Sequence, residues 1–596
     1  MNAYQAILGN GIPPALILIF AGIIAPVFEK NLKKTIYLFA AVFTLITVFY
    51  TPNMTGWILS SGFTGDMIFG KVDNLSKVFA VIFSIITFAG LLYSIHSNSS
   101  LKISSGLVYA GGGLGVVFAG DFFTLYIFWE IMAVASTFLV LDGKTKKALK
   151  SGFIYIMIHI AGGLFLLGGI IIHVMKTGSY EIVPMSLSNL EGSLIFIGIA
   201  VNAAVFPVHA WLKDAYPEAS PEGAVFLSAF TTKSAVYLFA RTFAGADLLI
   251  YAGLIMATLP LVYALIENDI RRTLAYCLIN QVGFMLVAIG VGTELAVNGA
   301  AAHAFSHILY KALLFMTAGA VIYQTGKRKF TELGGLYKEM PYTAMFAIIG
   351  ALSVSFPFFC GYASKSLIIL AVEEAHMKTA WLMLEFGSAG VFVAAGARFV
   401  YGIFFGESSV KGKGEAPGNM LFAMFTVSAV SIIVGTSPEL LYSMLPYTME
   451  SVKFFEISVL IPKLQLLFFA VFGFMILTKY GLIPKESEGK LIDTDTIYVR
   501  TSEIIYSFFD KTLNSLNTYF DKVFIKTLIP FVSKRALNLS TDITKIFLKI
   551  FLPASTEKEN IISQTDKYES KSVYPTGLNA AAAIAFVIIV FLIASN

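Results

Sequence analysis

The chain has 596 residues, of which 57% are hydrophobic and only 13% are charged, and its mean hydropathy is +0.77. A soluble domain of this size would carry about twice that share of charged residues, so the composition excludes one and indicates a polytopic membrane protein. The net charge of +5 is small and does not by itself imply a nucleic-acid partner.

The N-terminal apolar run has no basic region and no small-residue cleavage site before or after it. We therefore expect a retained membrane helix here and not a signal peptide. Cys277 and Cys360 both lie inside apolar segments. Neither a disulfide framework nor a zinc site is expected from them.

Apolar runs of roughly 17 to 25 residues are long enough to cross a bilayer, and about sixteen such spans are expected. Three N-terminal membrane helices are expected within residues 1–100. The spans lie near residues 11–28, 34–51, 78–96, 103–119, 121–141, 151–175, 193–216, 222–241, 247–267, 273–292, 297–323, 341–373, 380–406, 418–436, 456–480 and 575–595.

The seventh and twelfth spans each contain a proline, Pro207 and Pro357. Proline frees backbone groups, which a membrane helix tolerates only where they face protein or a watery cavity. The breaks therefore fall at the same position in two units of five helices, residues 101–245 and 246–406. Because five is odd, the second unit should be inverted relative to the first, as in transporters with ion sites at broken helices.

Basic residues are concentrated in the loops after odd-numbered spans, for example at Lys144, Arg271 and Lys327. The positive-inside rule places these loops in the cytoplasm and the N-terminus outside. We expect the protein in the cell (plasma) membrane.

Two further spans are expected within residues 407–480, and the pattern then changes over residues 481–574. Apolar residues there recur at spacings of three and four with charges between them, which predicts an amphipathic helix, interrupted at Pro530 and stopped at Pro553. Some fifty residues of helix reach on the order of 75 Å. Residues 575–596 form an anchoring span at the far end of this lateral helix.

Charged residues inside the predicted spans are the candidate site. Glu130, Lys233, Lys311 and Lys365 are each surrounded by apolar sequence. A charge at membrane depth costs a few kcal/mol or more unless it is paired or hydrated, so these residues suggest a pathway for protons or ions. The alternatives are a structural ion pair for Glu130 and lysines that extend to an interface.

His303, His307 and Lys311 are spaced at i, i+4 and i+8, which places them along one helix face over about 12 Å. Histidine exchanges protons near neutral pH, and this line of groups therefore predicts a proton relay. The alternative is a pair of structural histidines beside a lysine that extends to an interface. His209, just after the break at Pro207, is a weaker candidate.

No phosphate-binding loop, dinucleotide fingerprint, CxxC pair or haem-attachment site is present. We therefore expect no cofactor, no metal and no redox centre in this chain. Whether the chain belongs to an enzyme then depends on its partners. Asp269, Arg271 and Arg272, which lie in a loop, are expected to tie helices together.

Five segments resemble the antiporter-like subunits shared by respiratory complex I, Mrp-type cation/proton antiporters and membrane-bound hydrogenases. They are FWEIM, FPVHAWLKDAYPEASPEGA, ENDIRRTLAYCLINQVGFM, HAFSHILYKALLFMTAG and GYASKSLIIL. The resemblance covers spans three to fourteen and implies two inverted five-helix bundles with broken seventh and twelfth helices. It implies that Glu130 is the fifth-helix glutamate, Lys233 the eighth-helix lysine, Lys311 the central lysine and Lys365 the twelfth-helix lysine.

One position departs from the family pattern. The seventh-helix lysine that would pair with the glutamate is replaced by Asn202. Glu130 then pairs with Lys233, or the N-terminal half-channel is altered or inactive. Lys213 is a weaker candidate nearer the cytoplasmic end.

The resemblance implies an ion-translocating subunit, moving H⁺, Na⁺ or both, in a complex with other membrane subunits that the lateral helix contacts. Within this hypothesis, a redox-driven pump and a D-type component of an Mrp Na⁺/H⁺ antiporter stay open. A stand-alone secondary transporter and a scaffold with an inactive half-channel are further alternatives. The bilayer is a partner of any such protein, and nucleic acid is not.

Overall fold

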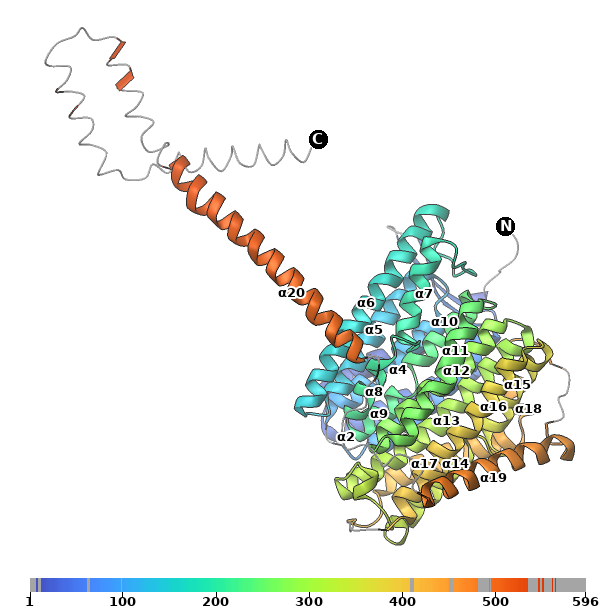
Figure 1. The fold of residues 1–596 in the computed structure, drawn as a ribbon. Helices are drawn as coiled ribbons and strands as arrows, with labels where there is room; N and C mark the ends of the chain where they lie inside the picture. Colours follow the sequence, from blue (N-terminus) through green and yellow to red (C-terminus); the bar gives the residue numbers. More distant parts are fainter. Residues whose placement is uncertain are drawn as a thin grey trace. The chain divides into compact units, whose positions relative to one another are not determined.

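The computed structural model describes residues 7–8, 12–61, 65–97, 99–407, 412–449, 454–480, 493, 495–533, 545–546, 549–550, 560 and 563. The chain divides into two units, residues 1–495 and 496–596, and each is described by itself. The first unit is a bundle of apolar helices (Figure 1).

The elements of the bundle follow one another with short connections. The first part contains β1 (Ile7–Leu8), α1 (Pro14–Ile24), the 3-10 turn η1 (Ala25–Val27), α2 (Lys30–Tyr50), β2 (Thr55–Ser61), β3 (Gly65–Lys71), α3 (Asn74–Ser94), α4 (Ser100–Phe118), α5 (Phe122–Leu141) and α6 (Lys146–Thr177). The middle part contains α7 (Leu190–Asn202), α8 (Ala210–Ala215), η2 (Tyr216–Glu218), α9 (Pro221–Leu227), α10 (Thr231–Thr242), α11 (Asp247–Ile266), α12 (Ile270–Val291) and α13 (Glu294–Thr325).

The last part of the bundle contains η3 (Phe330–Glu332), η4 (Leu336–Lys338), α14 (Pro341–Leu352), α15 (Cys360–Glu374), α16 (Lys378–Val391), the π-helical turns η5 (Phe392–Arg398) and η6 (Tyr401–Phe405), α17 (Gly418–Thr436), α18 (Glu439–Tyr442) and α19 (Ile457–Lys479). Helix α20 (Asp495–Phe520) and the π-helical η7 (Asp521–Leu528) follow.

Among the described residues, twelve helices are long and apolar enough to cross a membrane, and three shorter apolar helices accompany them. These helices coincide with fifteen of the predicted spans, and the predicted polytopic helical fold is confirmed, with one small sheet added to it. The expected anchoring span at 575–595 lies outside the described residues.

Both predicted helix breaks are present. Pro207 lies between α7 and α8, and Pro357 lies between α14 and α15. Each break holds a residue other than glycine with positive φ, Ala204 at 53° and Phe358 at 67°. Such a residue costs roughly 1–2 kcal/mol relative to ordinary helical backbone, so the surrounding contacts must hold both breaks open.

Those contacts are visible at each break. At the first, the Trp211 indole donates a hydrogen bond of 3.0 Å to the carbonyl of Val201, which also accepts a 3.1 Å bond from the backbone N–H of Ala204. At the second, Gly435 of α17 packs directly on the backbone: a Cβ at Gly435 would lie 2.3 Å from the Cα of Phe359. Only glycine permits this approach, because any larger residue would push α17 away from the break.

Burial identifies the centre of the bundle. In α12 and α13, 94% of the most apolar window is buried, against 28% in α2 and 39% in α6. Residues on α12 and α13 therefore face other helices, whereas α2 and α6 present large apolar side chains outward, as lipid-facing helices do.

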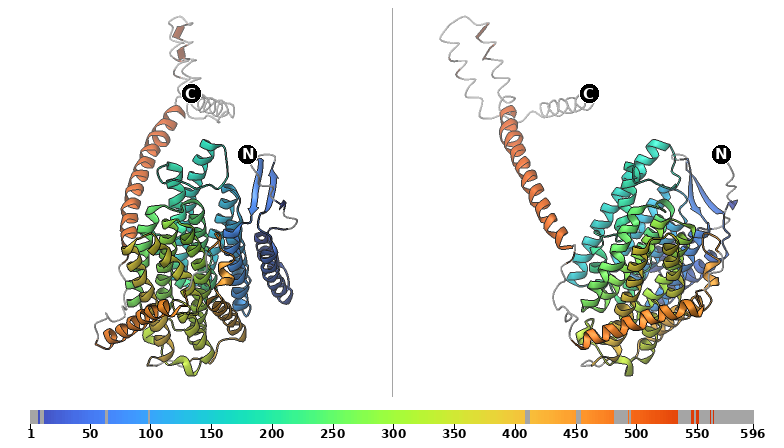
Figure 2. Two further views of the ribbon diagram at one scale, coloured as in Figure 1. Left: turned by 90° about the vertical axis from the view of Figure 1, so that its right-hand side faces the viewer. Right: turned by 45° about the vertical axis from the view of Figure 1, so that its right-hand side comes forward.

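A small sheet, which the sequence did not predict, lies beside the helices (Figure 2). Its order is β1-β2-β3, with β2 and β3 antiparallel and β1 parallel to β2. The Asp121 carboxylate joins the sheet to α5, since it accepts 2.7 Å hydrogen bonds from the backbone N–H groups of Ile68 and Thr124. Strands β2 and β3 lie in the connection between α2 and α3, and β1 precedes α1; none of these segments has an apolar run long enough to be predicted as a span.

Helix α19 coincides with the predicted fifteenth span but packs unlike the other helices. Only Leu467 of this helix is buried, and in Figures 1 and 2 the helix crosses the bundle obliquely instead of running along it. It contacts α16 and η5. It is therefore a tilted, peripheral helix laid against the C-terminal half.

The second unit begins with the predicted amphipathic helix. Its described part is helical without interruption to residue 533, and most of its side chains are exposed. The expected interruption at Pro530 is wrong: the helix passes through this proline after the π-helical turn η7. Proline has no N–H group, so it leaves one helix carbonyl without its usual hydrogen bond. A π-helical turn also changes which carbonyl each N–H group reaches, and here this turn lies just before the proline.

Candidate functional site

The central helix α13 carries the three residues predicted to lie along one helix face, which we call the ladder. His303, His307 and Lys311 are all fully buried. The two imidazole rings lie 6.0 Å apart between centroids, and the His307 ring lies 5.3 Å from that of Tyr310. The ladder is therefore a line of buried polar groups on one of the most buried helices of the described bundle.

His303 is held by residues from two other helices. Its Nε2 lies 3.1 Å from the side-chain oxygen of Gln281 on α12, and its Nδ1 lies 3.0 Å from the hydroxyl of Ser364 on α15. The Tyr310 hydroxyl donates a 2.8 Å hydrogen bond to the same oxygen of Gln281. The ladder thus forms where α12, α13 and α15 converge.

His307 and Lys311 are less completely bonded. Neither ring nitrogen of His307 has a hydrogen-bond partner among the described residues. The Lys311 ammonium has one long hydrogen bond, 3.5 Å to the carbonyl of Leu274. Buried polar atoms almost always have a hydrogen-bond partner, which is ordered water where no protein group is near. We therefore expect ordered water in this part of the core.

The other two lysines are bonded at interruptions in their helices. The Lys365 ammonium donates to the hydroxyl of Ser355, inside the second break, at 2.8 Å, and lies 5.4 Å from the centre of the Phe284 ring. The Lys233 ammonium donates to the carbonyl of Ser228, in the turn between α9 and α10, at 2.7 Å. Both side chains are buried. Broken backbone therefore supplies the oxygen atoms that hold these charges.

The N-terminal half is arranged differently. Glu130 on α5 is partly buried, and its Oε1 has no hydrogen-bond partner in the described part of the chain. This oxygen occupies space left by Gly163 of α6, where a Cβ would lie 2.1 Å from it. No ion pair joins Glu130 to Lys233 among the described residues, so the structure does not contain the pairing that the sequence left open.

Asn202 lies at the last position of α7, immediately before the first break. It is fully buried, and neither its amide nitrogen nor its carbonyl oxygen has a partner among the described residues. The position where the family carries a lysine is therefore still a polar one, with an unsatisfied donor and acceptor.

His209 and Lys213 lie away from the ladder, around a carboxylate that sequence reasoning missed. His209 Nε2 lies 3.4 Å from Asp493 Oδ1, and the Lys213 ammonium lies 3.8 Å from Asp493 Oδ2. The Tyr276 hydroxyl donates to the same carboxylate at 3.2 Å. Asp493 comes from just before α20, and no local pattern in the sequence pointed to it.

The loop arginines tie helices together, as predicted. Arg328 pairs with Asp269 and, at 3.0 Å, with Glu218, while both terminal nitrogens of Arg271 bond to the carbonyl of Ala219. Burial opposes the charge of Arg328, but the carboxylates of Asp269 and Glu218 raise the pKa of its guanidinium above the ordinary value. These contacts tie the connections around Ala219, Asp269 and Arg328 to one another.

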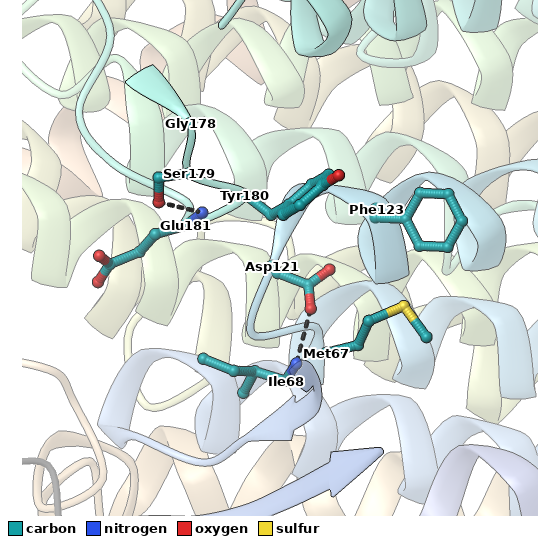
Figure 3. Close-up of a pocket in the computed structure, with 8 residues that line it drawn as sticks. All are labelled: Met67, Ile68, Asp121, Phe123, Gly178, Ser179, Tyr180 and Glu181. Atoms are coloured by element: carbon teal, nitrogen blue, oxygen red, sulfur yellow. Dashed lines mark hydrogen bonds between the residues drawn. The ribbon is translucent and has the colours of Figure 1, made fainter. Parts of the chain in front are cut away.

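A hollow of about 400 Å³ lies where β3, the start of α5 and the connection after α6 meet (Figure 3). Its acidic residues are Asp121 and Glu181. Asp121 is already engaged in capping α5 and holding β3, and the hollow contains none of the predicted charged residues. We assign it no part in the site.

Metal ligation finds no support in the described residues, where no three His, Cys, Asp or Glu side chains cluster as ligands would. Cys277 and Cys360 are free and buried. The described core presents lysines, histidines and hydroxyls, which are groups able to exchange protons with one another and with water.

Comparison with known proteins agrees with this geometry. Residues 119–391 match the family model described as NADH:quinone oxidoreductase/Mrp antiporter, TM. The A component of a Na(+)/H(+) antiporter from Alkalihalophilus pseudofirmus is 29% identical over 438 residues, covering 64% of this chain and 54% of that protein. The A/B component of a probable K(+)/H(+) antiporter from Rhizobium meliloti is 28% identical over 434 residues, covering 65% and 43%. This chain thus spans about half the length of these curated relatives.

Two solved structures share the fold. The Mrp complex from Dietzia sp. DQ12-45-1b aligns with a TM-score of 0.65 at 21% identity, over 72% of this chain and 95% of the matched one. The membrane-bound sulfane sulfur reductase, an archaeal respiratory membrane complex, aligns with a TM-score of 0.67 at 24% identity, over 98% and 99%.

The described residues form a polytopic helical protein with two broken helices beside a buried line of histidines and lysines. Over residues 119–391 the chain is similar to the transmembrane region of NADH:quinone oxidoreductases and Mrp antiporters.

Proposed function

We propose that this chain is the ion-translocating, antiporter-like subunit of a multisubunit membrane complex and moves H⁺, Na⁺ or both. One observation carries the proposal: a single buried helix holds His303, His307 and Lys311, and the buried lysines of two further helices, Lys233 and Lys365, are each held at an interruption in their helix. Such charges at membrane depth are costly, and in proteins they mark ion pathways.

The mechanism that we propose is electrostatic. Loss of a proton from one lysine removes its repulsion of the next and so favours a proton there, which couples the sites along the line. His307, with two unpartnered ring nitrogens among the described residues, can take a proton from water on one side and return it on the other. Glu130, Lys233, Lys311 and Lys365 are the charged members of this axis.

The setting of the subunit is part of the proposal. We infer two inverted five-helix units, an N-terminus outside the plasma membrane, and neighbouring membrane subunits contacted in part by the amphipathic helix at 495–533. The source of energy must lie in those neighbours or in an ion gradient, because the sequence contains no nucleotide or redox motif. A redox-driven pump and an Mrp-type antiporter therefore differ in their partners and not in this chain.

The purified complex in proteoliposomes tests the proposal. We expect a Na⁺ gradient, or turnover of a redox partner, to change the internal pH reported by a trapped dye. Mass spectrometry of the same sample identifies the partners: iron–sulfur subunits indicate a pump, and small membrane subunits alone indicate an antiporter. A complex that moves neither ion under either driving force would contradict the proposal.

Substitution of Asn202 by lysine tests whether the N-terminal half lies on the path. The change replaces the two unpartnered polar atoms of Asn202 at the first break by a positive charge, and by the family resemblance a lysine at this position would pair with Glu130. We expect the transport rate to change by about tenfold or more in either direction, the size of effect that a repositioned proton-transfer group produces. Asn202→Gln is the matched control, and a lysine variant that transports like wild type would exclude this position from the path.

A further inference from the structure

A line of buried polar groups leads from Lys365 to the edge of the bundle. The lysine donates to the Ser355 hydroxyl at 2.8 Å, and this hydroxyl lies 3.3 Å from that of Ser388 on α16. Ser355 and Ser388 are both buried. The second break thus supplies a hydroxyl that connects the twelfth-helix lysine to the next helix.

A cavity of about 20 Å³ continues this line. It is lined by Ser355, Lys365, Glu385, Ser388 and Lys463, with apolar walls from α19. About 10–15 Å³ of such space accommodates one water molecule, and the polar lining offers it several partners. A single water here would join the two serine hydroxyls to the Glu385 carboxylate.

The cavity ends at an ion pair between helices. Glu385 on α16 pairs with Lys463 on the tilted helix α19. The side chains are 9% and 25% exposed, respectively, so the pair lies between the interior and the surface. Apolar contacts would be enough to hold α19 against the bundle, and the helix buries only Leu467. An ion pair at this place is therefore not needed for stability.

The position along the helices suits an outer gate. Glu385 is seven residues from the start of α16 at Lys378, about 10 Å along the helix axis. Lys463 likewise lies near the start of α19, which begins at Ile457. Both starts follow even-numbered spans, and the sequence-based orientation places those ends outside. The charge of Glu373 on α15 also acts on Lys463, so two carboxylates attract this lysine.

We propose that Glu385 and Lys463 form the outer gate for ions that leave Lys365, with α19 as the moving element; this inference rests on the proposed function. In the closed state the ammonium of Lys463 pairs with the Glu385 carboxylate and blocks the cavity. A proton passes from the Lys365 ammonium through the Ser355 hydroxyl and water to that carboxylate. The neutral carboxylic acid releases Lys463, which stays charged, and the proton then leaves to outside water, regenerating the pair.

Thiol accessibility tests the gate independently of transport. Ser388→Cys places a reporter on the cavity wall, and the fully buried Cys277 and Cys360 provide the background. We expect a charged, membrane-impermeant thiol reagent to label this cysteine slowly in the purified complex. Lys463→Met should raise the labelling rate by about tenfold or more, because the plugging charge is gone. Lys479→Met, at the other end of α19, is the matched control and should not change it.

Transport provides the second readout. Glu385→Gln should lower flux by about tenfold or more, since the amide cannot take up the proton. Exchange of the charges, Glu385→Lys with Lys463→Glu, should restore a slow labelling rate, because the pair re-forms in the opposite sense. Equal labelling of Ser388→Cys with and without Lys463, or wild-type flux in Glu385→Gln, would overturn the gate.

Failure of the gate and failure of the proposed function give different results. If the wild-type complex moves no ions, the proposed function is wrong, yet the labelling comparison still reports whether Lys463 closes the cavity. If flux depends on Lys311 but neither labelling nor flux responds at Glu385 and Lys463, the function stands and ions leave elsewhere. If the Glu385→Gln complex does not assemble, the labelling rate of Ser388→Cys in the Lys463→Met background by itself decides whether Lys463 closes the cavity.

Discussion

Replacement of Lys311 by alanine is expected to abolish ion translocation while leaving the complex assembled. The ammonium is the charged end of the central ladder, and without it a proton reaching His307 would have no charged site to continue to. We expect the flux to fall by about a hundredfold or more, as loss of an essential proton-transfer group does. Dye-reported pH changes in proteoliposomes that contain the purified variant complex measure this directly.

Assembly should survive because the Lys311 ammonium is only weakly hydrogen-bonded among the described residues. Its one described hydrogen bond is 3.5 Å long, and removal of a buried charge also removes its desolvation cost. Lys479→Ala, at the end of α19, is the matched control for loss of a lysine from an apolar helix. A Lys311→Ala complex that transports at the wild-type rate would show that the path avoids this residue.

Replacement of Gln281 by leucine is expected to cause the second largest effect, on both stability and transport. The glutamine side chain bonds to His303, Tyr310 and Asn280, so leucine leaves three buried polar groups without a partner. Each unsatisfied group costs about 1–3 kcal/mol. We expect a clearly lower unfolding temperature of the purified complex and a flux reduced by about tenfold or more, because His303 loses the contact that orients its ring.

Two variants separate these effects. Gln324→Leu removes a glutamine of the central helix α13 that bonds to the Glu415 carbonyl near the helix end, and it should cost less stability and no transport. Gln281→Glu keeps an acceptor for Tyr310 and His303 and should retain more stability than leucine does. A Gln281→Leu complex as stable and active as wild type would mean that water replaces the whole network.

The membrane-spanning pattern could be read from the sequence because a bilayer limits the choices so strongly. A helix of about 20 apolar residues is the simplest way to satisfy backbone groups in hydrocarbon, so apolar runs locate helices and prolines locate breaks. For the same reason Glu130, Lys233, Lys311 and Lys365 stood out, and helical spacing alone placed His303, His307 and Lys311 on one face.

The contacts of those charges were not predictable from local pattern. His303 bonds to Gln281 and Ser364, which are 22 and 61 residues away, and uncharged side chains of this kind occur throughout the spans. Asp493 and Lys463 come from the C-terminal part, where the sequence suggested only a helix and a connection. The absence of a Glu130–Lys233 pair among the described residues likewise depends on how α5, α6 and α10 pack.

The sequence by itself determined that this is a membrane protein, where its helices lie, where two of them break, and which residues carry charge inside the bilayer. It could do so because hydrophobicity, proline and helical spacing act within one segment of chain. Only the tertiary structure decided which oxygen holds each lysine, that α19 lies obliquely across the bundle, and that its Lys463 pairs with Glu385. These features depend on distances between helices far apart in the chain, and packing alone sets those distances.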